Sequence, residues 1–151
     1  MYQYISKQKL NTSIDEAWCF LSDPKNLKVI TPPYMGFEIV SGAERPVFAG
    51  QVIRYRVRPL FGIPLTWITE ITHADEGKYF VDEQRFGPYK FWHHKHFITE
   101  TKDGVEMEDI VDYKLPLGLV GRLLHKIFIF REIHNIFEFR RKELHKIFNK
   151  G

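Results

Sequence analysis

Residues Val105–Leu124, VEMEDIVDYKLPLGLVGRLL, decide the fold class, because the hydrophobic period changes within them. Over Val105–Leu115 side chains alternate between two faces, one of them mostly apolar, which predicts a strand with one covered side. Pro116 and Gly118 then interrupt the alternation. Over Leu119–Phe148 apolar residues recur mostly at steps of three and four, which predicts one long helix.

The residues before this stretch predict two short helices and a run of antiparallel strands. Tyr2–Leu10 alternates as a strand, and Ser13 with Glu16 three residues later forms a capping box that starts a helix. Asp23-Pro24 ends that helix and opens a second short one. Further strands joined by short links are expected at Phe37–Val40, Gln51–Arg58, Leu65–His73, Tyr79–Phe86 and Tyr89–Thr99.

This order of elements predicts an α+β fold in a single domain, residues 1–151. We expect a curved antiparallel sheet of about six or seven strands, with one covered and one solvent-facing side. The sheet would wrap around the long C-terminal helix, and the two short helices would follow the first strand. Because one helix cannot fill the hollow of a strongly bent sheet, a cavity is expected between them.

Composition excludes several classes of protein. The single cysteine, Cys19, rules out a disulfide within the chain and a cysteine-rich zinc site. No run of about 20 apolar residues is present, so we predict no membrane span. The first residues lack the basic and apolar regions of a signal peptide, which favours a cytoplasmic protein.

Basic charge gathers on the predicted C-terminal helix. Residues 119–150 hold eight Lys or Arg against three Glu, although the whole chain carries a net charge of only +3. Such a segment suits an acidic partner, a nucleic acid, an anionic membrane or simply a solvated helix face. We favour the solvated face and predict no nucleic-acid partner, because no recognition motif accompanies the charge.

Three histidines lie close together in Phe86–Phe97, FGPYKFWHHKHF. Strand alternation places His94 and His96 on one side with Trp92, and we expect that side to face the cavity. Asp109 lies on the covered side of what is predicted to be the neighbouring strand. These three polar residues admit a metal site, a general acid–base group or a polar wall of a pocket. We favour the polar wall and predict no metal and no cofactor.

Aromatic and apolar residues on the covered faces are the other candidates for contact with a ligand. The loop that follows the second short helix would lie near the cavity mouth and contributes two adaptable side chains. The full set of candidate ligand-binding residues is Tyr34, Met35, Tyr55, Trp67, Phe80, Gln84, Trp92, His94, His96, Met107, Asp109, Val111 and Tyr113.

The order of elements resembles the START-related superfamily (SRPBCC), the helix-grip fold of birch-pollen-allergen-like proteins and polyketide cyclases. Asp23–Pro33, Phe80–Phe97 and Glu108–Gly121 carry a closer likeness to its small bacterial ligand-binding branch. The resemblance covers nearly the whole chain. It implies a pocket for a hydrophobic small molecule and brings no catalytic residue.

Two functions from different classes follow as expectations. In the first, the protein binds a hydrophobic or amphipathic small molecule between sheet and helix, for carriage or sensing. In the alternative, a group of His94 or His96 with Asp109 serves a cyclase-, dehydratase- or hydrolase-like enzyme as general acid–base. The absence of a nucleophile motif favours the first. The sequence leaves the oligomeric state open.

Overall fold

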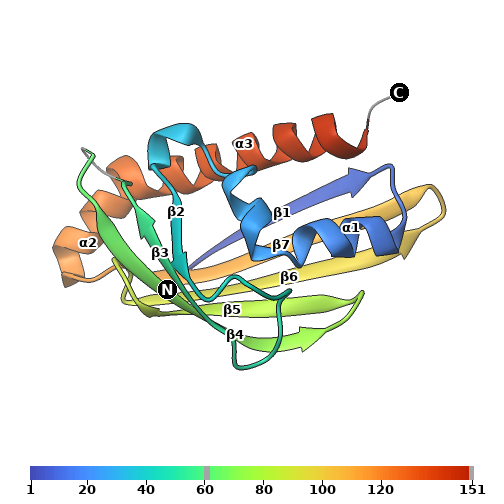
Figure 1. The fold of residues 1–151 in the computed structure, drawn as a ribbon. Coiled ribbons are helices and arrows are strands. Elements are labelled where there is room, and N and C mark those ends of the chain that lie inside the picture. Colours follow the sequence, from blue (N-terminus) through green and yellow to red (C-terminus); the bar gives the residue numbers. More distant parts are fainter. Residues whose placement is uncertain (60–61, 150–151) are drawn as a thin grey trace.

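The computed structural model describes residues 1–59 and 62–149, and it contains one sheet, short helices after the first strand and one long C-terminal helical segment (Figure 1). The strands are β1 (Tyr2–Leu10), β2 (Glu38–Ser41), β3 (Val52–Val57), β4 (Leu65–Asp75), β5 (Tyr79–Phe86), β6 (Phe91–Thr101) and β7 (Gly104–Lys114). The helices are α1 (Ile14–Leu21), 3-10 turns at Pro24–Lys28 and Pro33–Met35, α2 (Gly118–Leu124), a π-helical segment (His125–Ile129) and α3 (Phe130–Phe148).

The seven strands form a curved antiparallel sheet in the order β1-β7-β6-β5-β4-β3-β2. Successive strands from β2 to β7 are neighbours. β1 pairs with β7 and forms one edge of the sheet, and β2 forms the other. The register between β4 and β5 shifts twice, after Ile68 and after Ile71, and such bulges bend a sheet. The α+β class, the antiparallel sheet and the C-terminal helix predicted from the sequence are therefore confirmed.

The two short helices after β1 begin where the sequence predicts them. The Ser13 hydroxyl accepts a hydrogen bond of 3.1 Å from the backbone N–H of Glu16. The carboxylate of Glu16 accepts from the Thr12 hydroxyl at 2.6 Å. The Asp23 carboxylate accepts from the backbone N–H of Lys25 at 3.0 Å, and Pro24 occupies the first position of the following turn.

Strand alternation sorts side chains between the core and the solvent. In β3, Ile53, Tyr55 and Val57 are buried, whereas Val52, Arg54 and Arg56 are exposed. In β7 every second residue from Val105 to Tyr113 is buried. The concave face of the sheet therefore carries the core, as the period of two predicts.

The C-terminal helical segment differs from the prediction in two ways. Its path runs without a break from Gly118 to Phe148, but the π-helical segment interrupts the α-helical hydrogen bonding. The predicted apolar stripe is covered only in α3, where Ile133, Phe137 and Leu144 are buried. The stripe residues before α3 and at its start are exposed, namely Val120, Leu123, Leu124, Ile127 and Phe130. Only α3 lies along the sheet, and α2 lies at the end of the molecule (Figure 1).

A tight turn sets the direction of α2. Leu117 and Gly118 both adopt positive φ angles, of 72° and 52°, which redirect the chain as it leaves β7. A Cβ atom at Gly121 would lie 2.1 Å from the carbonyl oxygen of Pro116, so only glycine permits this close approach. The link between the strands predicted at Gln51–Arg58 and Leu65–His73, a turn from Pro59 to Pro64, includes Leu60 and Phe61, which lie outside the described residues.

Candidate functional site

A cavity of about 350 Å³ lies between the concave face of the sheet, the short helices and α3. Most of its lining is aromatic or aliphatic, and its polar residues include a group on β5, β6, β7 and α3. Nine of the residues singled out from the sequence line it, namely Met35, Tyr55, Trp67, Phe80, Trp92, His94, His96, Met107 and Asp109. Such a lining is typical of a site for a small apolar or amphipathic molecule.

The other four candidates lie outside the lining. Tyr34 is 57 % exposed, and its hydroxyl donates to the Glu132 carboxylate at 2.9 Å. Gln84 is held by the backbone of Tyr89, donating to its carbonyl at 2.6 Å and accepting from its N–H at 3.0 Å. Val111 and Tyr113 are fully buried where β7 packs against the helix, so they belong to the core.

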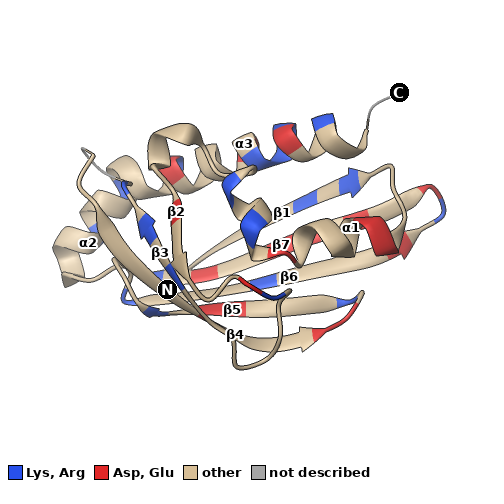
Figure 2. Ribbon diagram, viewed as in Figure 1, with Lys and Arg blue, Asp and Glu red and all other residues tan. Residues whose placement is uncertain are grey.

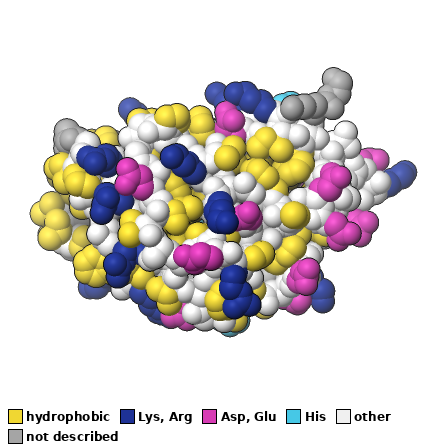
Figure 3. All heavy atoms as spheres, viewed as in Figure 1, with side chains coloured by type: hydrophobic (Ala, Val, Ile, Leu, Met, Phe, Trp, Pro, Cys, Tyr) yellow, Lys and Arg dark blue, Asp and Glu magenta, His cyan; other side chains and the backbone are white. Residues whose placement is uncertain are grey.

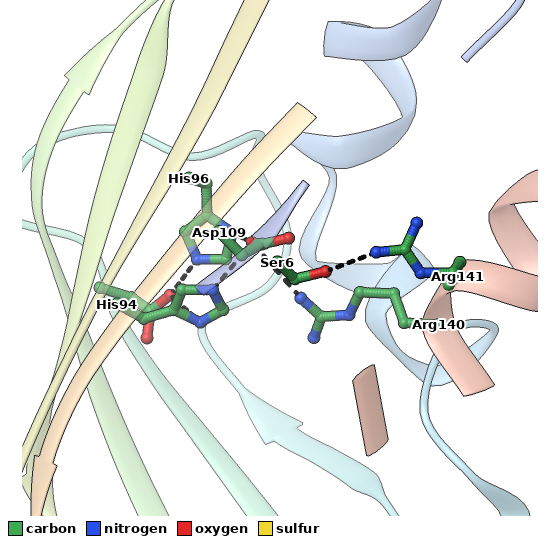
Figure 4. Close-up of polar contacts among 7 residues, drawn as sticks. Ser6, His94, His96, Asp109, Arg140 and Arg141 are labelled. Atoms are coloured by element: carbon green, nitrogen blue, oxygen red, sulfur yellow. Dashed lines mark hydrogen bonds and ion pairs between the residues drawn. The ribbon is translucent and has the colours of Figure 1, made fainter. Parts of the chain in front are cut away.

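Five polar side chains meet on one wall of the cavity, and we call them the polar cluster: Asp82, His94, His96, Asp109 and Arg140. The sheet register explains four of them, because Asp82 pairs with His94 across β5 and β6 and His96 pairs with Asp109 across β6 and β7. Arg140 reaches the same place from α3 (Figure 4).

Hydrogen bonds join the two histidines to the two carboxylates. His94 Nε2 lies 2.8 Å from Asp109 Oδ1, and His96 Nε2 lies 2.5 Å from Asp82 Oδ2. His96 Nδ1 is also 3.2 Å from Asp109 Oδ1. The two imidazole rings stack with their centroids 3.6 Å apart. The placement of His94 and His96 beside Asp109 agrees with the strand-alternation prediction.

Asp82 and Arg140 were not among the candidates chosen from the sequence. Asp82 shares a strand face with Phe80 and Gln84, but its contact with His96 depends on the register between β5 and β6. Arg140 lies in the gap between Phe137 and Leu144, where the apolar stripe is interrupted. The interruption was a usable signal, because the helix turns the same face toward the sheet there.

The cluster assigns different protonation states to its two histidines. Burial lowers the pKa of His94 to about 4, with a further lowering from the charge of His96, so His94 is neutral at pH 7. Burial by itself would lower the pKa of His96, but hydrogen bonds to Asp109 and Asp82 raise it above its usual value. His96 is therefore the histidine that carries a proton most readily.

Both carboxylates of the cluster are held ionised. Burial alone would raise the pKa of Asp109, but hydrogen bonds from His94 and His96 and the charge of Arg140 bring it far below its usual value. The pKa of Asp82 is lowered in the same way, against the effect of burial, mainly by its hydrogen bond with His96. Two negative charges thus face the positive charge of Arg140, and His96 adds a second positive charge when it is protonated.

Some polar atoms of the polar cluster have no hydrogen-bond partner. Arg140 Nη1 lies 3.7 Å from Asp109 Oδ1, which is beyond hydrogen-bond distance. Within residues 1–59 and 62–149, Arg140 Nε and Asp109 Oδ2 are buried without a hydrogen-bond partner. The guanidinium also lies over the Phe137 ring, 4.9 Å from its centroid. Arg140 is thus a buried cation with donors that its neighbours leave unused.

The cluster also contains a possible metal-ligand set. One ligand atom each from Asp82, His94 and His96 lie within 4.8 Å of one another. Two histidines and a carboxylate are a known set. However, Asp82 is already bonded to His96, and a metal ion would have to displace the proton that they share. The positive charge of Arg140 beside the set also opposes a further cation, so the donor arrangement favours a hydrogen-bonded ion cluster.

Solved structures show the same fold in proteins of very different sequence. TTHA0849 from Thermus thermophilus matches with a TM-score of 0.70 at 16 % identity, over 96 % of this chain and 95 % of that one. CV1439 from Chromobacterium violaceum matches with a TM-score of 0.76 at 9 % identity, over the full length of both chains. XoxI from Bacillus cereus matches with a TM-score of 0.67 at 13 % identity, over 99 % of this chain and 97 % of that one.

These likenesses show the fold alone, because the identities are low. The sheet and C-terminal helix fit the helix-grip arrangement expected from the sequence. No protein-family model matches the chain, and no curated protein matches it.

Proposed function

We propose that this protein binds an amphipathic small molecule in the cavity, with its apolar part among the aromatic side chains and its polar end at Arg140. The observation that carries the proposal is the apolar cavity of about 350 Å³ with a buried, incompletely paired guanidinium in its wall. The role is that of a carrier or sensor in a START-related, helix-grip protein of the small ligand-binding branch. A cytoplasmic location belongs to the same proposal.

The chemistry of the wall defines the polar end of the ligand. A guanidinium offers only donors, so its partner must accept hydrogen bonds, as a carboxylate or carbonyl does. Charge-assisted hydrogen bonds to a carboxylate are stronger than neutral ones, and they are worth more where water is excluded. The preferred ligand is therefore an organic anion with an apolar tail.

Matched ligands that differ only in their polar end test this proposal. We expect decanoate to quench or shift the fluorescence of Trp67 and Trp92 on binding, and to bind at least about tenfold more tightly than 1-decanol. Arg140→Gln should reduce this preference to near unity. Arg141→Gln is the control, because Arg141 reaches Ser6 and the Lys7 carbonyl outside the cavity, and it should retain the preference (Figure 4).

The outcomes separate the two parts of the proposal. If neither compound binds, and native mass spectrometry detects no bound molecule, the cavity-binding function is wrong. If both bind equally and Arg140→Gln changes nothing, the function stands but the role of Arg140 is wrong.

Affinity should also rise about fourfold for each added methylene until the cavity is full, since burying one methylene is worth about 0.8 kcal/mol.

A second candidate function is acid–base catalysis on a bound carbonyl compound. His96 favours it, because the side chain lines the cavity, carries a raised pKa and is bonded to two carboxylates. His94, with its lowered pKa, would be the neighbouring base.

The catalytic function is tested by identifying the bound molecule with native mass spectrometry and then asking whether the protein converts it. NMR should detect turnover that His96→Gln abolishes while binding persists, and the outward-facing His93→Gln should leave it unchanged. A bound molecule that is recovered chemically unaltered after prolonged incubation would exclude the catalytic function for that molecule.

A further inference from the structure

An exposed apolar surface runs along α2, the π-helical segment and the first residue of α3. Leu119 is 77 % exposed, Ile127 is 64 % exposed and Leu123 is 59 % exposed. These three residues follow one another at steps of four and so lie along one row of the helix. Val120, Leu124 and Phe128 form a second exposed row at the same spacing. We call residues 117–131 the α2 face.

The α2 face carries positive charge and no negative charge. Residues 117–131 contain Arg122, Lys126 and Arg131, and no Asp or Glu. Arg122 and Lys126 are four residues apart and therefore form a basic row of the same helix. The ribbon in Figure 2 has basic positions at this end of the molecule, and Figure 3 shows hydrophobic side chains gathered there together with basic ones. A helix with exposed apolar rows and basic neighbours is typical of a segment that lies in a membrane interface.

The α2 face also borders the cavity. Leu117, Gly121, Leu124 and Phe128 belong to the cavity lining, and Leu117, Leu124 and Phe128 are at the same time exposed at the surface. The segment therefore separates the cavity from the outside at this end of the molecule. A surface that met the α2 face would therefore contact residues that also line the cavity.

We propose that the α2 face docks on an anionic lipid bilayer, with its apolar rows among the acyl chains and its basic residues against the headgroups. Both properties of the face match this partner, since burial of exposed apolar side chains and attraction to anionic lipid add. A second copy of the chain fits less well. A symmetric contact would place the α2 face against itself, and its basic residues would then meet with no acidic partner among residues 117–131. Within the described residues no helix is long and apolar enough to cross a membrane.

Vesicle flotation with the full chain tests this surface. We expect the protein to float with phosphatidylcholine vesicles containing about 30 % phosphatidylglycerol and to bind pure phosphatidylcholine much more weakly. Leu123→Glu combined with Ile127→Glu should reduce binding at least about tenfold, because it removes apolar contact and adds negative charge. Ile5→Glu is the matched control, since Ile5 is 52 % exposed on β1 and lies outside the α2 face.

A charge variant separates binding to anionic lipid from nonspecific hydrophobic adsorption. Arg122→Gln with Lys126→Gln should weaken binding to the anionic vesicles roughly tenfold or more, and high salt should have the same effect. The proposal is overturned if the wild type does not float with anionic vesicles. It is equally overturned if Ile5→Glu reduces binding as much as the α2-face variant does. It is also overturned if light scattering shows a dimer that the α2-face variant converts to monomer, because the patch would then be occupied by a second copy.

Discussion

Asp109→Leu is expected to lower the free energy of unfolding by about 3–5 kcal/mol, the usual cost of removing one partner from a buried ion cluster. The Asp109 residue is 1 % exposed and lies in contact with His94, His96 and Arg140. Without its carboxylate, Asp82 would be the one anion left in the cluster to balance the buried Arg140 and any proton on His96. Urea denaturation followed by circular dichroism measures the loss.

Glu108→Leu is the matched control, one residue earlier on the same strand. Its side chain faces outward and pairs with Lys7 at 3.4 Å, so its removal should cost no more than about 1 kcal/mol. Combining Asp109→Leu with Arg140→Met should recover part of the loss, because the uncompensated cation is removed as well. Equal effects of Asp109→Leu and Glu108→Leu would show that the cluster does not contribute as described.

The second large effect is a loss of stability as the pH falls from about 6.5 to 4. His94 is neutral in the folded protein, with a pKa of about 4, whereas the unfolded chain has the ordinary value of 6.5. Over this range the unfolded state takes up a proton that folded His94 does not, so stability is full above the unfolded pKa and falls with pH. The difference between these two pKa values corresponds to a loss of up to about 3 kcal/mol.

The other titrating groups of the cluster act in different pH ranges. The pKa of His96 is raised, so its contribution is present at low pH and is lost as the pH rises through the folded value, above 6.5. Asp82 and Asp109 have lowered pKa values, so their contributions are lost only as the pH falls below about 4.

Denaturation midpoints at a series of pH values isolate the effect of His94. His94→Gln should flatten the dependence between pH 6.5 and 4, because its side chain cannot take up the proton. His93→Gln, on the outer face of the same strand, should keep the wild-type slope. An unchanged slope in His94→Gln would mean that another group causes the acid sensitivity.

The sequence was sufficient to predict the sheet and to predict which face of a strand each residue occupies. Alternation in β3 and β7 separates Tyr55 from Arg54 and Asp109 from Glu108, and the structure has the same separation. The reason is that successive residues of a strand point to opposite faces, so the side of every residue is known once the buried face is known. The same rule divides the three histidines of β6 into an inward pair and the outward His93.

Relations between distant elements could not be predicted from periodicity. The meeting of Asp82 with His96 depends on strand register, and the approach of Arg140 to Asp109 depends on how α3 lies across the sheet. Val111 and Tyr113 share a face with Asp109, yet they are buried against Ile133 and Phe137 and not at the cavity. The apolar pattern of residues 119–130 predicts a helix but does not identify what covers it, because hydrophobic periodicity is the same whether a stripe meets a sheet or another surface.

A crystal structure of the protein with bound decanoate tests the central proposal most directly. We predict electron density for the alkyl chain between Trp67, Trp92 and α3, with the carboxylate within hydrogen-bond distance of the Arg140 guanidinium. A cavity filled by the protein's own side chains, or decanoate bound elsewhere with Arg140 left unpaired, would contradict it.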